Sequence, residues 1–150
     1  MSSPNLVSFA ATLHVRDHCL CLHTQRAARH LSRRFDAAFR SIGLTSGQFS
    51  MLMGLNRPTP ARIRDLTNLL AMDRTTVTAA LKPLERRSLI SVIADPDDSR
   101  SRLVTLTAAG VTLLSLALPI WTLAHADVDA ALATGEDGHL RAALRALALG

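Results

Sequence analysis

Residues 61–106 carry the pattern that most restricts the fold: two short amphipathic helices around a very tight connection, then two β-rich segments. The first helix is predicted over 61–71, because its apolar residues recur at spacings of three and four. The second is predicted over 74–87, with Asp73 as the N-cap residue. Only Met72 and Asp73 separate them. Two helices joined by so short a turn form a helix-turn-helix.

The two β-rich segments predict a hairpin after the second helix. Residues 89–93 and 103–106 are short runs of β-branched and aliphatic side chains, which is typical of strands. The connector 94–102 contains an Asp-Pro step and five charged residues, so we expect a charged loop at the tip of the hairpin. A helix-turn-helix followed by such a hairpin is a winged helix, and the predicted fold is mainly α with a small β-hairpin wing.

Helical patterns flank this unit on both sides. An amphipathic helix is predicted over 17–42, and the spacing of Thr45 and Gln48 is that of a capping box that opens a further short helix. Thr59 with Pro60 is expected to start the helix over 61–71. Downstream, Thr107 caps a long helix, and a break at 134–135 separates it from a last helix over 136–149.

The length of 150 residues fits one domain with a core of its own. We predict a single domain over 1–150, with a winged-helix lobe at about 45–107 and helical regions at about 1–42 and 108–150. The longest apolar run, 113–124, is interrupted by two hydroxyl side chains and a proline and is shorter than the roughly 18 residues of a membrane span. No basic residue precedes the apolar stretch of the first fifteen residues, so we expect a cytoplasmic protein without membrane partners.

Positive charge is concentrated in one part of the chain. Residues 16–102 hold fifteen basic and eight acidic side chains, a net of +7, whereas residues 103–150 have a net of −2. All but one of the basic residues are arginines, which suit bidentate contacts with phosphates and bases. This segregation favours a nucleic-acid partner. The alternative is a winged helix that binds proteins and no DNA, but it predicts an apolar or acidic wing tip.

Three segments closely resemble the MarR family of bacterial transcription regulators: Leu84–Ile90, Asp95–Arg100 and Leu106–Gly110. The likeness spans about residues 17–125. It implies a homodimer of two winged-helix lobes bound to a palindromic operator, in most cases as a repressor, with dimerisation through N- and C-terminal helices. The apolar residues that would form this dimer interface are Leu6, Phe9, Leu13, Leu140, Leu144 and Leu147.

Both lines of reasoning assign the same residues to double-stranded DNA. The helix after Asp73 would lie in the major groove, where its first turn meets base edges and phosphates. The wing would reach the minor groove; by resemblance Arg100 is the inserted residue and Asp98 the acid that orients it. The candidate DNA contacts are Arg74, Thr75, Thr76, Thr78, Lys82, Asp98, Ser99, Arg100 and Arg102. Phosphate contacts are also expected from Arg62, Arg64 and Arg86.

Two cysteines lie within the predicted first helix. Cys19 and Cys21 would point roughly 200° apart there, because each helical residue turns the chain by about 100°. They are candidates for redox or effector sensing, and packing as small apolar residues is the alternative. His14, His18 and Cys21 share one helix face, as zinc ligands can, but no second ligand cluster exists, so we expect no metal and no cofactor.

Regulation by a small molecule is the family's usual mode. The residues that would line such a pocket, or equally the core, are Phe39, Phe49, Met51, Met53 and Trp121. An enzyme is not expected, because the chain has no Gly-rich phosphate loop, no nucleophile elbow and no recognisable pairing of carboxylates with histidine. The sequence therefore predicts a DNA-binding regulator whose release signal is a ligand or a thiol oxidation.

Overall fold

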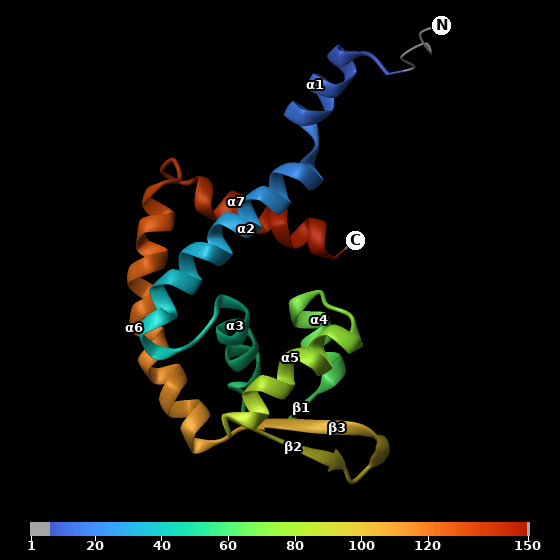
Figure 1. Cartoon of the computed structure of the whole chain (residues 1–150), viewed down its shortest axis with the longest axis vertical. Coiled ribbons are helices and arrows are strands. Elements are labelled where there is room, and N and C mark those ends of the chain that lie inside the picture. The colour runs from blue at the N-terminus through green and yellow to red at the C-terminus, as the bar shows by residue number, and fades with distance from the viewer. Residues whose placement is uncertain (1–6, 150) are drawn as a thin grey trace, which may run out of the picture.

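The chain folds mainly into helices, with a small antiparallel sheet at one end of the molecule (Figure 1). The structure is a computed structural model that describes residues 7–149. The elements are α1 (Phe9–His18), α2 (Leu20–Phe39), the 3-10 turn η1 (Arg40–Ile42), α3 (Ser46–Leu55), β1 (Ala61–Arg62), α4 (Ile63–Leu70), α5 (Arg74–Arg86), β2 (Ile90–Asp95), β3 (Asp98–Leu106), α6 (Ala108–Ala130) and α7 (Glu136–Ala148). The predicted fold class is confirmed.

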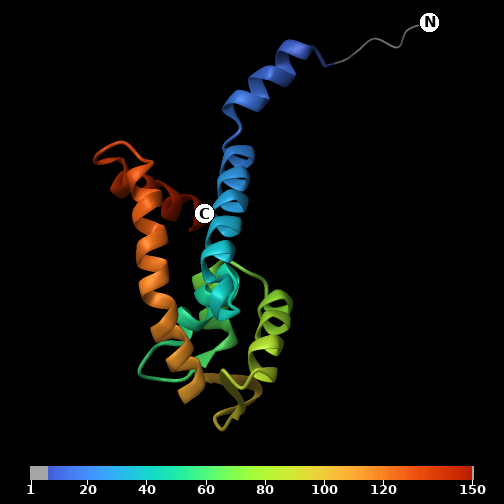
Figure 2. The same cartoon turned by 60° about the vertical axis from the view of Figure 1, so that its left-hand side comes forward.

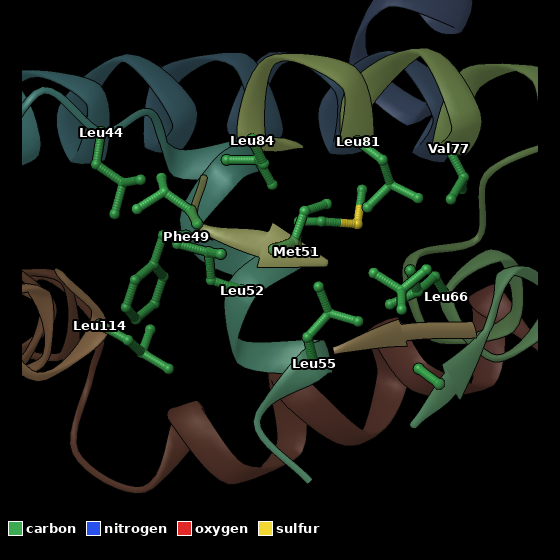
Figure 3. Packing of buried hydrophobic residues seen from close by; sticks show 14 of the residues in the cluster. Leu44, Phe49, Met51, Leu52, Leu55, Leu66, Val77, Leu81, Leu84 and Leu114 are labelled. Atoms are coloured by element: carbon green, nitrogen blue, oxygen red, sulfur yellow. The ribbon is translucent and has the colours of Figure 1, made fainter. Parts of the chain in front are cut away.

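The helix-turn-helix consists of α4 and α5 and packs on α3, the central helix of the core. Leu52 of α3 is completely buried between apolar side chains of the other helices (Figure 3). The inner face of α5 is Val77, Leu81 and Leu84, one side chain per turn, as the periodicity predicts. Each of these residues belongs to the same core cluster, so α5 is held rigidly with its polar face outward.

The wing differs from its prediction in length. β2 and β3 extend to residues 95 and 98, so the turn between them is only Pro96 and Asp97. The four candidate DNA contacts assigned to this loop, Asp98, Ser99, Arg100 and Arg102, therefore lie on β3. The error arises because polar and charged residues on a solvent-facing hairpin pair through their backbones as well as apolar ones do, so composition does not mark the strand end.

A third strand also separates the predicted helix start from the observed one. Ala61 and Arg62 form β1, which pairs with Val104 and Leu103 of β3. Helix α4 begins at Ile63, with Arg62 as N-cap, and the carboxylate of Asp65 accepts a hydrogen bond from the Arg62 backbone N–H at 2.8 Å. The start predicted at Thr59 and Pro60 is wrong by three residues, because pairing with β3 holds this backbone extended.

The continuous helix predicted from residue 17 is broken at Cys19. Cys19 has an extended backbone and is both the C-cap of α1 and the N-cap of α2. Its thiol accepts the backbone N–H of Leu22 at 3.5 Å, and the ring of His23 bonds the carbonyl of Asp17 at 3.1 Å. These side chains satisfy backbone groups freed by the break. As a result, α1 extends away from the rest of the chain (Figures 1 and 2).

The two C-terminal helices begin where the sequence predicts, α6 directly after Thr107 and α7 at Glu136. Thr107 accepts the backbone N–H of Gly110 at 3.1 Å and so caps α6, which stays helical through Pro119. Contrary to the expectation from the interrupted apolar run, α6 is long and apolar enough to cross a membrane, with a mean hydropathy of 1.5 over its most apolar window. In the structure it packs along α2 and α3, and Leu114 and Ala117 join the core.

Candidate nucleic-acid interface

The first turn of α5 presents a row of exposed polar side chains. Thr75, Thr76 and Thr78 are all exposed at this end of the helix. Asp73 fixes the turn by accepting the backbone N–H of Thr76 at 2.8 Å and the Thr76 hydroxyl at 2.7 Å. These hydrogen bonds lower the pKa of Asp73. The hydroxyl proton of Thr76 is thus committed to the cap, whereas no such bond engages Thr75 or Thr78.

The wing places Arg100 on β3, beside the start of α5. Asp98 accepts the backbone N–H of Arg100 at 3.0 Å, so it shapes the backbone here and makes no ion pair with the guanidinium. Arg74 donates to the carbonyl oxygen of Arg100 at 3.3 Å, which joins the first residue of α5 to the wing. Ser99 and Arg102 are exposed on the same strand. The side chain of Arg100 is consequently free to meet a ligand.

Basic residues from three elements line the space between α5 and the wing. One groove is bounded by Arg74, Thr78 and Lys82 of α5 and by Arg100 and Arg102 of β3. A second hollow lies beside it, where Arg62 and Arg64 at the start of α4 meet Arg74 and Arg100. Six basic side chains predicted from scattered positions are thus brought together on one face. Arg86, at the far end of α5, lines neither hollow.

Sequence reasoning missed one residue of this face. Asp95 was assigned only to a turn, yet it is 3% exposed and is the one buried charged residue among residues 7–149. Arg62 Nε lies 3.0 Å from Asp95 Oδ2, an ion pair without the alignment of a hydrogen bond. The Asp-Pro step in the sequence signals a turn, and no local pattern signals burial of the carboxylate.

Comparison with known proteins identifies the family of the chain that carries this basic face. The MarR family model matches residues 44–101, which span α3 to the wing. The chain is 32% identical to the transcriptional regulator MosR of M. tuberculosis in its complex with DNA, with a TM-score of 0.80 over 88% of this chain and 95% of MosR. The chain belongs to the MarR family. Its regulators bind DNA through a winged helix, which is the lobe described above.

The chain is also similar to a transcriptional activatory protein and to a second protein whose DNA binding is regulated. The chain is 35% identical over 88 residues to the transcriptional activatory protein BadR of Rhodopseudomonas palustris; the match covers 57% of this chain and 50% of BadR. The chain therefore spans about half the length of that relative. It is 26% identical to Bordetella bronchiseptica BpsR, whose DNA binding is regulated by 6-hydroxynicotinic acid, with a TM-score of 0.77 over 87% of this chain and 93% of BpsR.

The two cysteines of this MarR-family chain lie at the break between α1 and α2. Cys19 is half-buried and non-helical, and Cys21 is exposed on the first turn of α2, where its sulfur accepts from Gln25 Nε2 at 3.3 Å. The argument that one helix holds their side chains roughly 200° apart is therefore wrong, because Cys19 is outside both helices. Within residues 7–149, no three His, Cys, Asp or Glu side chains are grouped as metal ligands would be.

The aromatic residues predicted for an effector pocket form part of the core. Phe39 and Phe49 are buried with ring centroids 4.8 Å apart, and Trp121 of α6 continues the stack at 6.4 Å from Phe49. Met51 is also buried, whereas Met53 is 40% exposed. A hollow beside this stack lies between α6 and α7, at Trp121, His125 and Arg141.

Proposed function

We propose that this MarR-family chain is a cytoplasmic repressor that binds a palindromic operator as a homodimer, one winged helix on each half-site. The observation that carries the proposal is the groove between α5 and the wing, where four basic side chains outnumber the one acidic side chain, Glu85. The basic residues are Arg74, Lys82, Arg100 and Arg102. A contiguous basic face of this kind is the electrostatic footprint of a DNA-binding surface.

Each element of the face has a separate role in this proposal. The start of α5 enters the major groove, where Thr75 and Thr78 contact base edges while Thr76 completes the cap with Asp73. Arg100 enters the adjacent minor groove, where narrow A·T-rich sequence has a strong negative potential. Arg102, Ser99 and Lys82 contact phosphates, as do Arg62 and Arg64; Asp98 fixes the backbone that carries Arg100. Arg86 contacts a more distant phosphate.

The homodimer is supported by apolar surface on the terminal helices. Phe9 of α1 and Leu140, Leu144 and Leu147 of α7 are all more than two-fifths exposed. Leu13 is half-buried, and Leu6 lies outside the described residues. Apolar stripes of this extent on single helices are typical of surfaces covered by a partner.

A signal that releases the DNA is proposed to act at the dimerisation helices. One route is a small ligand, as in the relative BpsR. The other is oxidation of Cys19 and Cys21 at the hinge between α1 and α2, where a change in the thiols would reorient α1. Addition of peroxide to the DNA complex separates the routes: release that a thiol reductant reverses, and that Cys19→Ser with Cys21→Ser abolishes, assigns the signal to the thiols.

The experiment that tests DNA binding is a fluorescence-anisotropy titration with the DNA upstream of the chain's own gene, over a salt series. Arg100→Ala is expected to weaken operator binding by about 1–3 kcal/mol, the usual worth of a specific groove contact. Arg145→Ala is the matched control, because it removes the same charge from α7, away from the groove. Equal losses in both variants, or a salt-independent affinity, would contradict the proposal.

A further inference from the structure

The wing is tied to the helix-turn-helix through a buried ion pair. Asp95 closes the wing turn with Oδ1, which accepts the backbone N–H of Asp97 at 2.9 Å. Its other oxygen lies 3.0 Å from Nε of Arg62, the residue immediately before α4. We propose that Asp95 and Arg62 are positioning residues that set the direction of the wing, so that Arg100 meets the DNA. This inference rests on the proposed function.

The topology explains why this pair controls the direction of the wing. The strand order is β1-β3-β2, so Arg62 on β1 and Asp95 on β2 are separated by the central strand. Arg62 is opposite Leu103 of β3, whereas Asp95 is opposite Asp98, near the turn. The ion pair therefore runs diagonally across β3 and joins the base of the sheet to the far end of the wing. Without it, the part of the wing between Leu103 and the turn is held by the backbone pairing of β2 with β3 and by the hydrogen bond from Arg74 to the Arg100 carbonyl.

Burial makes the pair selective for one arrangement. A carboxylate that is 3% exposed has lost most of its hydration, and only a close cation offsets that cost. Any displacement of the wing that separates Asp95 from Arg62 leaves this charge buried and unpaired. The bond from Arg74 to the Arg100 carbonyl holds the other side of the wing at the first turn of α5. Arg100 is therefore positioned from both helices of the helix-turn-helix.

The negative charge of Asp95 and its proposed positioning role predict opposite effects on DNA affinity when the carboxylate is removed. Removing a carboxylate near DNA should strengthen binding, since it removes repulsion from the phosphates. If Asp95 positions the wing, its removal should weaken binding instead. Asp97→Asn is the matched control: it removes the same charge two residues away, where the side chain is exposed and makes no ion pair among the described residues.

The test compares Asp95→Asn, Asp97→Asn and the wild type by operator anisotropy, each with and without Arg100→Ala. We expect Asp97→Asn to bind as tightly as the wild type or more tightly, and Asp95→Asn to bind about tenfold more weakly. In the Asp95→Asn background, Arg100→Ala should add little, because the two act through one contact. Asp95→Asn that binds like Asp97→Asn, or full additivity with Arg100→Ala, overturns the inference.

Arg62→Lys is a second variant of the same ion pair, and it tests the inference even if Asp95→Asn fails to fold. It keeps a positive charge at position 62, where the side chain is partly exposed, but loses the planar Nε contact. It should lower operator affinity at least threefold more than it lowers affinity for random-sequence DNA, which reports the phosphate contact of Arg62 alone. This loss of specificity should also fail to add to that of Arg100→Ala. Unchanged specific affinity overturns the inference. If the wild type itself does not bind the operator, the proposed function fails; if only the Asp95 and Arg62 variants behave like their controls, the positioning role alone fails.

Discussion

At the scale of single residues, Gly110 lets the first turn of α6 pack directly against the backbone of Leu89, the residue before β2. A Cβ at position 110 would lie 2.1 Å from the Leu89 carbonyl oxygen, and backbone atoms cannot give way as a flexible side chain can. Gly110→Ala is therefore expected to lower the free energy of unfolding by about 1–3 kcal/mol, as overpacking does. Urea denaturation measures this value.

Gly138 supplies the control for that variant. It also lies in a helix, α7, but a Cβ there would meet nothing within 4 Å. Gly138→Ala should raise the free energy of unfolding by up to about 1 kcal/mol, the difference in helix propensity between the two residues. Equal free energies of unfolding for the two alanine variants would contradict this prediction, because α6 would then move away from Leu89 at no cost in stability.

Local residue roles could be predicted, and roles that depend on tertiary pairing could not. The caps at Asp73 and Thr107 were predicted correctly, because each accepts a backbone N–H three residues ahead. The role of Asp95 was missed, since its cation comes from β1, a strand that the sequence did not predict. Asp98 was predicted to orient the guanidinium of Arg100, but its carboxylate accepts the backbone N–H of Arg100 instead.

At the scale of elements, the cap of α5 makes this helix sensitive to acid. Hydrogen bonds from Thr76 favour the ionised form of Asp73 and lower its pKa below the ordinary 3.8. The cap therefore stabilises the fold fully above about pH 3.8, and its contribution is lost as the pH falls through the lower folded-state pKa. Asp73→Ala should melt at a lower temperature than the wild type at neutral pH.

The pH dependence of that difference tests the cause. The gap between the two melting temperatures should narrow as the pH is lowered below 3.8, because the wild type then loses the cap that the variant already lacks. Thermal melts followed by circular dichroism at several pH values measure the gap. A gap that stays constant down to pH 2 would mean that the charge of Asp73 contributes nothing to the cap.

Most element types could be predicted here, but strand β1 and several element boundaries could not. The apolar periodicity of α5 and α6 indicated helices because packing on the core enforces it. The break at Cys19 has no proline or glycine to mark it, and its cause is a thiol cap and a histidine ring. The wing strands were predicted too short, because their solvent-facing half carries charges and no apolar pattern.

At the scale of the whole molecule, the apolar faces of α6 and α7 are the surface that the proposed second copy would cover. α6 and α7 expose several leucines that no described part of the same chain covers, among them Leu123 at 74% exposure. The proposed dimer would bury these faces and place two wings at a fixed separation, which a palindromic operator needs. DNA affinity and dimerisation should therefore be lost together.

The double variant Leu144→Glu with Leu147→Glu tests this link, because it places two charges in the proposed interface. We expect its mass in light scattering to fall from twice 16.2 kDa to 16.2 kDa, and its operator affinity to fall at least tenfold. Leu69→Glu is the control, since Leu69 is 64% exposed but lies on α4, outside the terminal helices. A monomeric variant that keeps full operator affinity would contradict the dimer, because a single winged helix reads only one half-site and cannot gain from the second.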